Sequence, residues 1–285
     1  MKGVDKSEQN NFIDAAFYED VRDGDHTSLA TINSNSINKA RLIVKDEGVL
    51  AGVEFAKAVF AKVDPSYKME VLIEDGATVK YGDIAFIVEC NAQALLKAER
   101  LVLNTMQRLS GVASMSRKFL DAVDGIDVKI LDTRKTAPLM RFLEKWAVKI
   151  GGCENYRVGL YDWIMIKDNH VDACGSHALA IQKVHDYFDK KEMTLNITVE
   201  VRNLKELQEV LDKGRVTRIM LDNFNLDDLR AAVKMIDGQF QSEASGGVNL
   251  KTVRAIAETG VNYISVGALT HSAGSLDLSL KVIKE

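Results

Sequence analysis

Six residues suited to catalysis or ligand binding follow apolar runs in the second half of the chain. They are Lys135, Lys167, Glu200, Asp222, Ser245 and Gly267. From Lys167 onward the intervals are 33, 22, 23 and 22 residues, so the last three share one period. The carboxylates of Glu200 and Asp222 suit Mg²⁺ bound through water, ribose hydroxyls or an emerging cationic sugar. A salt bridge from either to Lys167 would complement these roles, because an unpaired lysine among strands is costly to desolvate.

Four cations accompany these carboxylates. Arg134 and Lys135 lie in LDTRKTAP, and Arg157 and Lys167 follow in the next segments. Arginine can hold a carboxylate in a bidentate manner, whereas lysine acts as a compact point charge. The mixed set therefore predicts a ligand with both carboxylate and phosphate groups. Lys145 and Lys149 differ, because their helical spacing in RFLEKWAVKI predicts a solvated helix face.

Two glycine-containing loops predict a phosphate site. Ser245, Gly246 and Gly247 lie between an apolar run and a helical segment, where backbone N–H groups at a helix start can bind phosphate. VGALTHS, with Gly267 and His271, repeats the arrangement one strand later. A tight turn would also explain the Gly-Gly pair. The two adjacent loops together favour phosphate binding.

The elements that position these residues alternate between strand and helix. From about Val128 onward, apolar runs such as VTRIMLDNF are each followed by a helical period, which predicts a parallel sheet. A period near 22 residues accommodates one strand, a helix of about three turns and two loops. We therefore expect an α/β barrel rather than a doubly wound sheet, with the candidate residues at its carboxyl-terminal mouth.

The first half has a different pattern. Short alternating runs such as MEVLIEDGATV mix with amphipathic stretches such as VEFAKAVFAKV, which indicates a small α+β domain. We expect domains at residues 1–110 and 111–285, with the C-terminal tail able to pack on the first domain.

Composition excludes several classes of protein. The net charge of −4 argues against binding nucleic acid through bulk electrostatics, and no stretch approaches the roughly 20 apolar residues needed to cross a membrane. Cys90, Cys153 and Cys174 are an odd set without CxxC spacing, so neither a disulfide framework nor a zinc site is indicated. The start lacks a basic region followed by an apolar one, and we expect a cytoplasmic protein.

Several segments in order resemble one enzyme family. LDTRKTAPLMR, GGCENYRVGLYD, IMIKDNHV, TVEVRN, IMLDNF, SGGVN and SVGALTHS closely resemble quinolinate phosphoribosyltransferase, also called nicotinate-nucleotide pyrophosphorylase (carboxylating). EDVRDGDHTS and AERLVLNTMQRLSGVA extend the likeness over nearly the whole chain. The resemblance implies an N-terminal α/β sandwich domain, an open TIM-like α/β barrel, and transfer of a phosphoribosyl group from phosphoribosyl pyrophosphate to quinolinate with loss of CO₂. The product would be nicotinate mononucleotide, a precursor of NAD.

The resemblance also implies roles for individual residues. Arg134, Lys135, Arg157 and Lys167 would bind quinolinate and phosphates. Glu200 and Asp222 would serve the ribose or its Mg²⁺. Ser245, Gly246, Gly267 and His271 would hold the 5′-phosphate, and Gly247 is expected to bind substrate with them. Arg100 would enter the site of the partner subunit in a homodimer.

One position departs from the family pattern. The family's motif usually has Asn-His-Arg, whereas Asn155, Tyr156 and Arg157 stand here. A neutral tyrosine can donate one hydrogen bond to a substrate carboxylate but cannot supply an imidazolium charge. We expect Tyr156 to contact the substrate, and we expect substrate affinity or the decarboxylation step to differ from that of family members with histidine at this position. His26 and His170 are weaker candidates, and a structural role at a strand end explains Asn169 and His170 equally well.

Three alternatives differ in substrate or class. A nicotinate phosphoribosyltransferase would bind one carboxylate and release no CO₂, and the number of cations favours quinolinate over it. The phosphoribosyltransferase-like protein associated with molybdate transport resembles TRKT and KDNH less well. EDGATVKYGDIAFIVE is similar to the glycine-bounded strands of biotinyl and lipoyl domains, but no lysine lies in the expected hairpin.

Overall fold

The computed structural model describes residues 4–283 of the chain. Contacts divide the chain into two compact units. The first comprises Met1–Arg117, Ala137–Gly152 and Ser272–Glu285, and the second comprises Lys118–Thr136 and Cys153–His271. No helix in the described range is long and apolar enough to cross a membrane.

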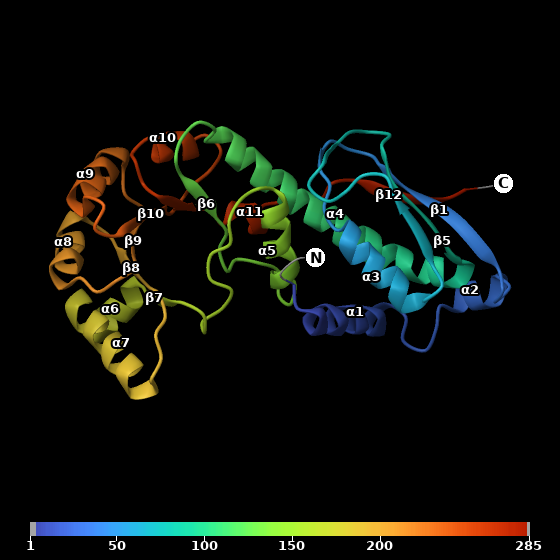
Figure 1. Cartoon of the computed structure of the whole chain (residues 1–285), viewed down its shortest axis with the longest axis horizontal. Helices are drawn as coiled ribbons and strands as arrows, with labels where there is room; N and C mark the ends of the chain where they lie inside the picture. The colour runs from blue at the N-terminus through green and yellow to red at the C-terminus, as the bar shows by residue number, and fades with distance from the viewer. Residues whose placement is uncertain (1–3, 284–285) are drawn as a thin grey trace. The chain divides into compact units, whose positions relative to one another are not determined.

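The first unit contains an antiparallel sheet of order β12-β1-β5-β3 (Figure 1). Its strands are β1 (Ile37–Val44), β3 (Lys68–Val71), β5 (Ile84–Asn91) and β12 (Leu278–Val282). A second small sheet pairs β2 (Gly48–Val49) with β4 (Thr78–Val79). The helices of the unit are α1 (Lys6–Asp20), α2 (His26–Thr31), α3 (Val53–Val63), α5 (Arg141–Ile150) and most of α4 (Ala92–Ala122).

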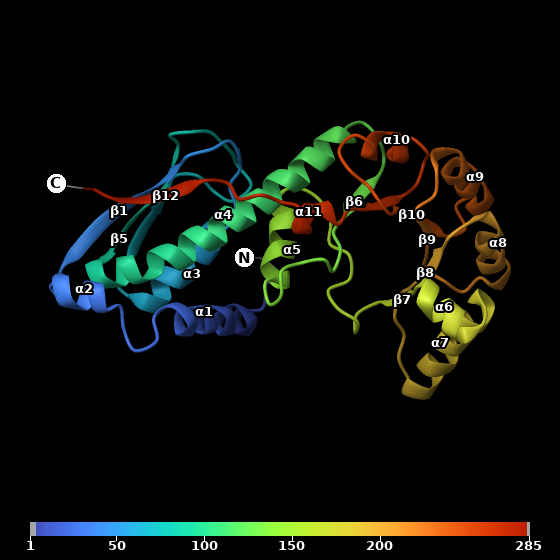
Figure 2. The same cartoon turned by 180° about the vertical axis from the view of Figure 1, so that it is seen from behind.

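Alternation of side chains gives this sheet one buried face. In β1, Ala40, Leu42 and Val44 are fully buried, while the residues between them are more exposed. Helix α3 buries Phe55 and Phe60, and it lies with α4 against the sheet in both views (Figure 2). The unit is thus the α/β sandwich expected for the N-terminal region, completed by the C-terminal strand β12.

Helix α5 belongs to this first unit because a buried ion pair and a backbone contact hold it there. Arg108 Nη2 of α4 lies 2.8 Å from Glu144 Oε1, and Arg117 Nε donates to the Gly151 carbonyl at 3.1 Å. The sequence had placed all of 111–285 in one barrel domain apart from the tail, whereas contacts assign 137–152 to the first unit. The solvated face expected for Lys145 is wrong: Lys145 is only 3% exposed, since α5 is packed in this unit, while Lys149 is exposed.

The second unit contains a parallel sheet of order β6-β11-β10-β9-β8-β7. The strands are β6 (Lys129–Leu131), β7 (Ile164–Ile166), β8 (Ile197–Val201), β9 (Arg218–Asp222), β10 (Gln241–Ser245) and β11 (Tyr263–Ser265). The helices are α6 (Asp168–Cys174), α7 (His177–Lys191), α8 (Leu204–Lys213), α9 (Leu226–Ile236), α10 (Val253–Ala257) and α11 (Ala268–His271). Strands β6 and β7 are the two edges of this sheet, so the predicted barrel is open between them.

Local sequence explains why each strand of this unit is followed by a turn into a helix. Ile197 and Val199 of β8 are buried, and α8 and α9 lie along the outside of the curved sheet (Figure 1). Asn203 caps α8 by accepting from the Glu206 N–H at 3.0 Å, and Asn225 caps α9 in the same way. These caps start α8 and α9 within a few residues of β8 and β9. Because every pair of strands in this sheet is parallel, the carboxyl ends of the strands lie at the same edge.

Candidate active site

The strand ends of the second unit bring four predicted residues to one edge. Ser245 of β10 pairs in register with Asp222 of β9, and Glu200 lies near the end of neighbouring β8. Lys167 follows the last residue of β7. The register of a parallel sheet therefore gathers positions that the sequence separates by 22 residues or more.

Asp222 lies close enough to Glu200 to oppose ionisation of the Glu200 carboxyl. Glu200 is 8% exposed, and its pKa is raised by burial and by the charge of Asp222. The Lys167 ammonium and the Asp168 backbone N–H act in the opposite direction. A pair of carboxylates with one lysine nearby is suited to a divalent cation or to a sugar that develops positive charge.

The Asp222 carboxylate is held by two neighbours. Ser245 Oγ donates to Asp222 Oδ1 at 2.5 Å, and Asn223 Nδ2 donates to Oδ2 at 2.6 Å. Asn223 has a left-handed backbone with φ of 57°, and a Cβ at Gly246 would lie 2.1 Å from Asn223 Oδ1. Gly246 thus makes room for the side chain that orients Asp222. Sequence reasoning missed Asn223, although its place directly after Asp222 was a signal.

The phosphate loop differs from the expected strand–glycine–helix arrangement. Helix α10 begins at Val253, so the Ser245–Gly247 segment lies several residues before the helix. A phosphate there would meet backbone N–H groups of the loop rather than those of a first helical turn. Gly247 has φ of 61°, a conformation that favours glycine.

Lys135, Gly267 and His271 meet at the neighbouring strand ends. Thr270 Oγ1 donates to the Lys135 carbonyl at 2.9 Å. A Cβ at Gly267 would lie 2.9 Å from His271 Nε2 and 3.1 Å from Lys135 Cδ. The absence of a side chain at Gly267 therefore lets two basic side chains approach each other, as an anionic ligand requires.

Arg134 and Arg157 form a second cationic pair. Arg157 Nη1 donates to the Trp163 carbonyl at 3.2 Å. The pKa of Arg157 is lowered by burial and by the charge of Arg134, while Asp162 acts in the opposite direction. Two guanidinium groups that repel each other favour an anion that binds both.

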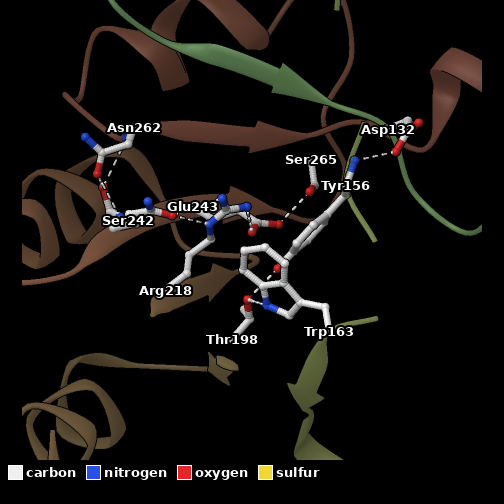
Figure 3. Close-up of polar contacts among 10 residues, drawn as sticks. Asp132, Tyr156, Trp163, Thr198, Arg218, Ser242, Glu243, Asn262 and Ser265 are labelled. Atoms are coloured by element: carbon white, nitrogen blue, oxygen red, sulfur yellow. Dashed lines mark hydrogen bonds and ion pairs between the residues drawn. The ribbon is translucent and has the colours of Figure 1, made fainter. Parts of the chain in front are cut away.

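Tyr156 points into the interior of the barrel (Figure 3). It is 8% exposed, its hydroxyl lies 2.5 Å from Thr198 Oγ1, and its backbone N–H donates to Asp132 Oδ1 at 2.8 Å. Burial raises the pKa of this phenol above its ordinary value, and Glu243 raises it further. The hydroxyl expected to meet a substrate carboxylate is thus engaged within the protein.

The remaining candidates have other surroundings. Arg100 is an exposed residue of α4 in the first unit, with its Nη1 3.5 Å from Asn104 Oδ1. His170 Nδ1 accepts a hydrogen bond from the Lys167 backbone N–H at 3.0 Å. This contact is the structural role at a strand end that the sequence offered as one explanation of His170. His26 lies exposed beside Asp23. Within residues 4–283, no three His, Cys, Asp or Glu side chains gather as a metal site.

An open parallel α/β barrel with cations and paired carboxylates at the carboxyl ends of its strands is the architecture of an enzyme for phosphorylated, anionic small molecules. Family models agree with this class. The C-terminal domain of quinolinate phosphoribosyl transferase matches residues 112–281, and its N-terminal domain matches residues 25–110.

Individual proteins with similar sequences or structures belong to the same family. A tobacco (Nicotiana tabacum) protein named quinolinate phosphoribosyltransferase [decarboxylating] 2b, mitochondrial, is 44% identical, with 92% of this chain and 78% of that protein covered. A probable nicotinate-nucleotide pyrophosphorylase [carboxylating] of Bacillus subtilis is 42% identical over 93% of this chain and 90% of its own. The crystal structure of NadC from Streptococcus pyogenes superposes with a TM-score of 0.93 at 34% identity, covering 100% of both chains. The chain belongs to the quinolinate phosphoribosyltransferase family.

Proposed function

We propose that this chain transfers the phosphoribosyl group of phosphoribosyl pyrophosphate to quinolinate, releasing pyrophosphate and CO₂ and forming nicotinate mononucleotide for NAD biosynthesis. The observation that supports this most is the set of cations at the strand ends: Lys135 lies beside His271, Lys167 follows β7, and Arg134 is near enough to Arg157 to lower its pKa. A dianionic pyridine and a phosphorylated sugar together need such a number of cations.

In the proposed reaction, the pyridine nitrogen attacks the anomeric carbon and the bond to pyrophosphate breaks. Arg134, Arg157 and Lys167 hold the carboxylates, and fixing the nitrogen near the carbon contributes about 7–11 kcal/mol of the barrier reduction. Glu200 and Asp222 stabilise the positive charge that develops on the sugar. The alkylated ring then loses its adjacent carboxylate as CO₂, and a proton from solvent replaces it on the ring.

Mg²⁺ fits the carboxylate pair. Asp222 raises the pKa of Glu200, so a cation between them would relieve repulsion. Oxygen ligands, with waters and substrate phosphates completing the shell, are those that Mg²⁺ prefers. When bound, the ion would neutralise charge on the pyrophosphate leaving group. Ser245, Gly246, Gly247, Gly267, Lys135 and His271 are proposed to hold the 5′-phosphate.

A homodimer is part of this proposal. Arg100 lies in the first unit, exposed and making only a long contact with Asn104 among the described hydrogen bonds. A guanidinium presented in this way suits donation to a neighbouring subunit's site. The cytoplasmic location expected from the sequence stays a prediction, and the tobacco relative is named mitochondrial.

One assay tests the proposed reaction. The protein is incubated with phosphoribosyl pyrophosphate, Mg²⁺ and either quinolinate or nicotinate, and pyrophosphate and CO₂ are both measured. We expect equal amounts of the two products with quinolinate and neither with nicotinate. Pyrophosphate without CO₂, or release only with nicotinate, would contradict the proposal and favour a nicotinate phosphoribosyltransferase. EDTA should abolish turnover and added Mg²⁺ should restore it.

A further inference from the structure

A chain of hydrogen bonds in the barrel interior passes through Thr198. The Thr198 hydroxyl on β8 is fully buried, 2.9 Å from Trp163 Nε1 and 2.5 Å from the Tyr156 hydroxyl. An indole N–H can only donate, so Thr198 Oγ1 accepts from Trp163. The single proton of Thr198 is then available for Tyr156 (Figure 3).

The far end of the chain fixes its direction. The Tyr156 hydroxyl also bonds to Glu243, whose carboxylate lies 3.1 Å from Arg218 Nη1 and accepts from Ser265 Oγ at 2.5 Å. Burial raises the pKa of Glu243, but a proton there would leave the buried Arg218 without a counter-charge. The carboxylate therefore accepts from Tyr156, and Tyr156 accepts from Thr198.

Aromatic packing holds the same side chains from another direction. The Arg218 Cζ atom lies 3.7 Å from the ring centre of Tyr263, 4.9 Å from that of Tyr156 and 5.2 Å from that of Trp163. Tyr156 and Trp163 also meet edge to face, with ring centres 5.5 Å apart. Both rings thus have one packed arrangement, which the bonds to Thr198 lock.

Both residues joined by Thr198 are linked to Arg157, one through the chain and one through a hydrogen bond. Tyr156 precedes Arg157 in the chain, and the Trp163 carbonyl accepts from Arg157 Nη1 at 3.2 Å. The charge of Arg134 lowers the pKa of Arg157, and the bond to the Trp163 carbonyl fixes the position of the Arg157 guanidinium. The Thr198 hydroxyl joins the two anchors of this tether.

We propose that Thr198 is a positioning residue, whose buried hydroxyl aligns the Arg157 guanidinium to bind a carboxylate of the pyridine substrate. This role rests on the proposed function. Thr198 itself is fully buried. It acts through Tyr156 and Trp163, and its loss reduces affinity for the pyridine dicarboxylate without a matching effect on the sugar phosphate.

The test compares Thr198→Val, which keeps the shape and removes the hydroxyl, with Thr198→Ser, which keeps the hydroxyl. We expect Thr198→Val to raise the KM for quinolinate about tenfold, since two buried partners lose their hydrogen bond. The KM for phosphoribosyl pyrophosphate stays within about twofold, and Thr198→Ser restores the quinolinate KM. Trp163→Phe removes the same bond from the other side and should raise the quinolinate KM too, which keeps the test decisive if Thr198→Val folds poorly.

Thr259→Val is the matched control. Thr259 is also buried in the second unit, and its Oγ1 donates to the Ile256 carbonyl at 2.7 Å within the same turn of chain. This variant should lower stability but leave the quinolinate KM unchanged. An unchanged quinolinate KM in Thr198→Val overturns the positioning role. So does a result in which the KM values for quinolinate and for phosphoribosyl pyrophosphate shift as much in Thr259→Val as in Thr198→Val.

A measurement without substrate separates this inference from the proposed function. The Arg157 Nε–H signal in ¹⁵N NMR should be sharp in the wild type, broadened in Thr198→Val and unchanged in Thr259→Val. If the wild type neither binds nor converts quinolinate, the proposed function fails, while this signal still decides whether Thr198 orders Arg157. A signal that stays sharp in Thr198→Val refutes the positioning role.

Discussion

The interior and the carboxyl-terminal edge of the barrel unit contain similar kinds of charged residues in opposite situations. In the interior, Arg218 and Glu243 pair with each other, and no buried side-chain nitrogen or oxygen of residues 4–283 lacks a hydrogen-bond partner. At the edge, Arg134 opposes Arg157, and Asp222 opposes Glu200. A buried charge that is paired within the protein contributes to the fold, because removing its partner is destabilising. Like charges that lie close together instead favour binding of a ligand of opposite charge.

The largest effect on stability is expected in the interior. Arg218→Met leaves the Glu243 carboxylate buried, 0% exposed, without its counter-charge. We expect the free energy of unfolding to fall by about 3–5 kcal/mol at neutral pH. Urea unfolding of the barrel unit is followed by Trp163 fluorescence in a Trp146→Phe background.

The control for this prediction is an exposed ion pair in the same unit. Arg230 Nη1 lies 2.9 Å from Asp227 Oδ1 on α9, with side chains 50% and 95% exposed. Arg230→Met should change the free energy of unfolding by less than about 1 kcal/mol. Equal losses of unfolding free energy in the two variants would mean that the interior ion pair contributes no more to stability than an exposed one.

The edge should respond in the opposite manner, in activity rather than stability. Lys167→Ala removes an exposed charge at the end of β7, and Lys135→Ala one after β6. We expect kcat/KM to fall by about 10²–10³-fold in each, while the free energy of unfolding changes by less than about 0.5 kcal/mol. Lys205→Ala, an exposed lysine on α8, is the control. Near-normal turnover in both site variants would contradict their assignment.

Much of the edge could be predicted from sequence, but little of the interior. The 22-residue spacing of Glu200, Asp222, Ser245 and Gly267 depends only on repeated strands and helices, and the parallel sheet has that arrangement. The interior depends on contacts between residues far apart in the chain. Arg218 and Glu243 stood within apolar runs, and only their even spacing from Asp222 and Ser245 indicated a shared face.

Three further features were hidden for the same reason. Contacts of 137–152 with the first unit depend on the pairing of Glu144 with Arg108, 36 residues away. The inward-pointing Tyr156 hydroxyl meets Thr198, 42 residues away. The bond from Ser245 to Asp222 crosses between strands. No local pattern specifies partners of this kind, because each is set by tertiary packing.

A smaller effect is expected from a glycine at the carboxyl-terminal edge, Gly246. Gly246→Ala places a Cβ 2.1 Å from Asn223 Oδ1 at a φ of 93°. We expect a stability loss of about 1–3 kcal/mol and lower activity, because Asn223 must release Asp222. Gly125→Ala, at φ of 80° with no atom within 4 Å, isolates the backbone cost alone. If Gly125→Ala reduces activity as much, the contact between Gly246 and Asn223 has no special role.

The smallest effect concerns the pH dependence of stability at the edge. Burial and Asp222 raise the pKa of Glu200, so the folded protein keeps that proton to a higher pH than the unfolded chain does. Between the two pKa values the folded state binds more protons, and stability therefore falls as pH rises through this interval. Glu200→Gln, which cannot ionise, should lose that part of the dependence. Urea unfolding of both proteins from about pH 4 to pH 7 measures it, since an unperturbed glutamate has a pKa near 4.3. Parallel stability curves would mean that Glu200 ionises without opposition from Asp222, and that the repulsion at this edge is already relieved in the absence of a ligand.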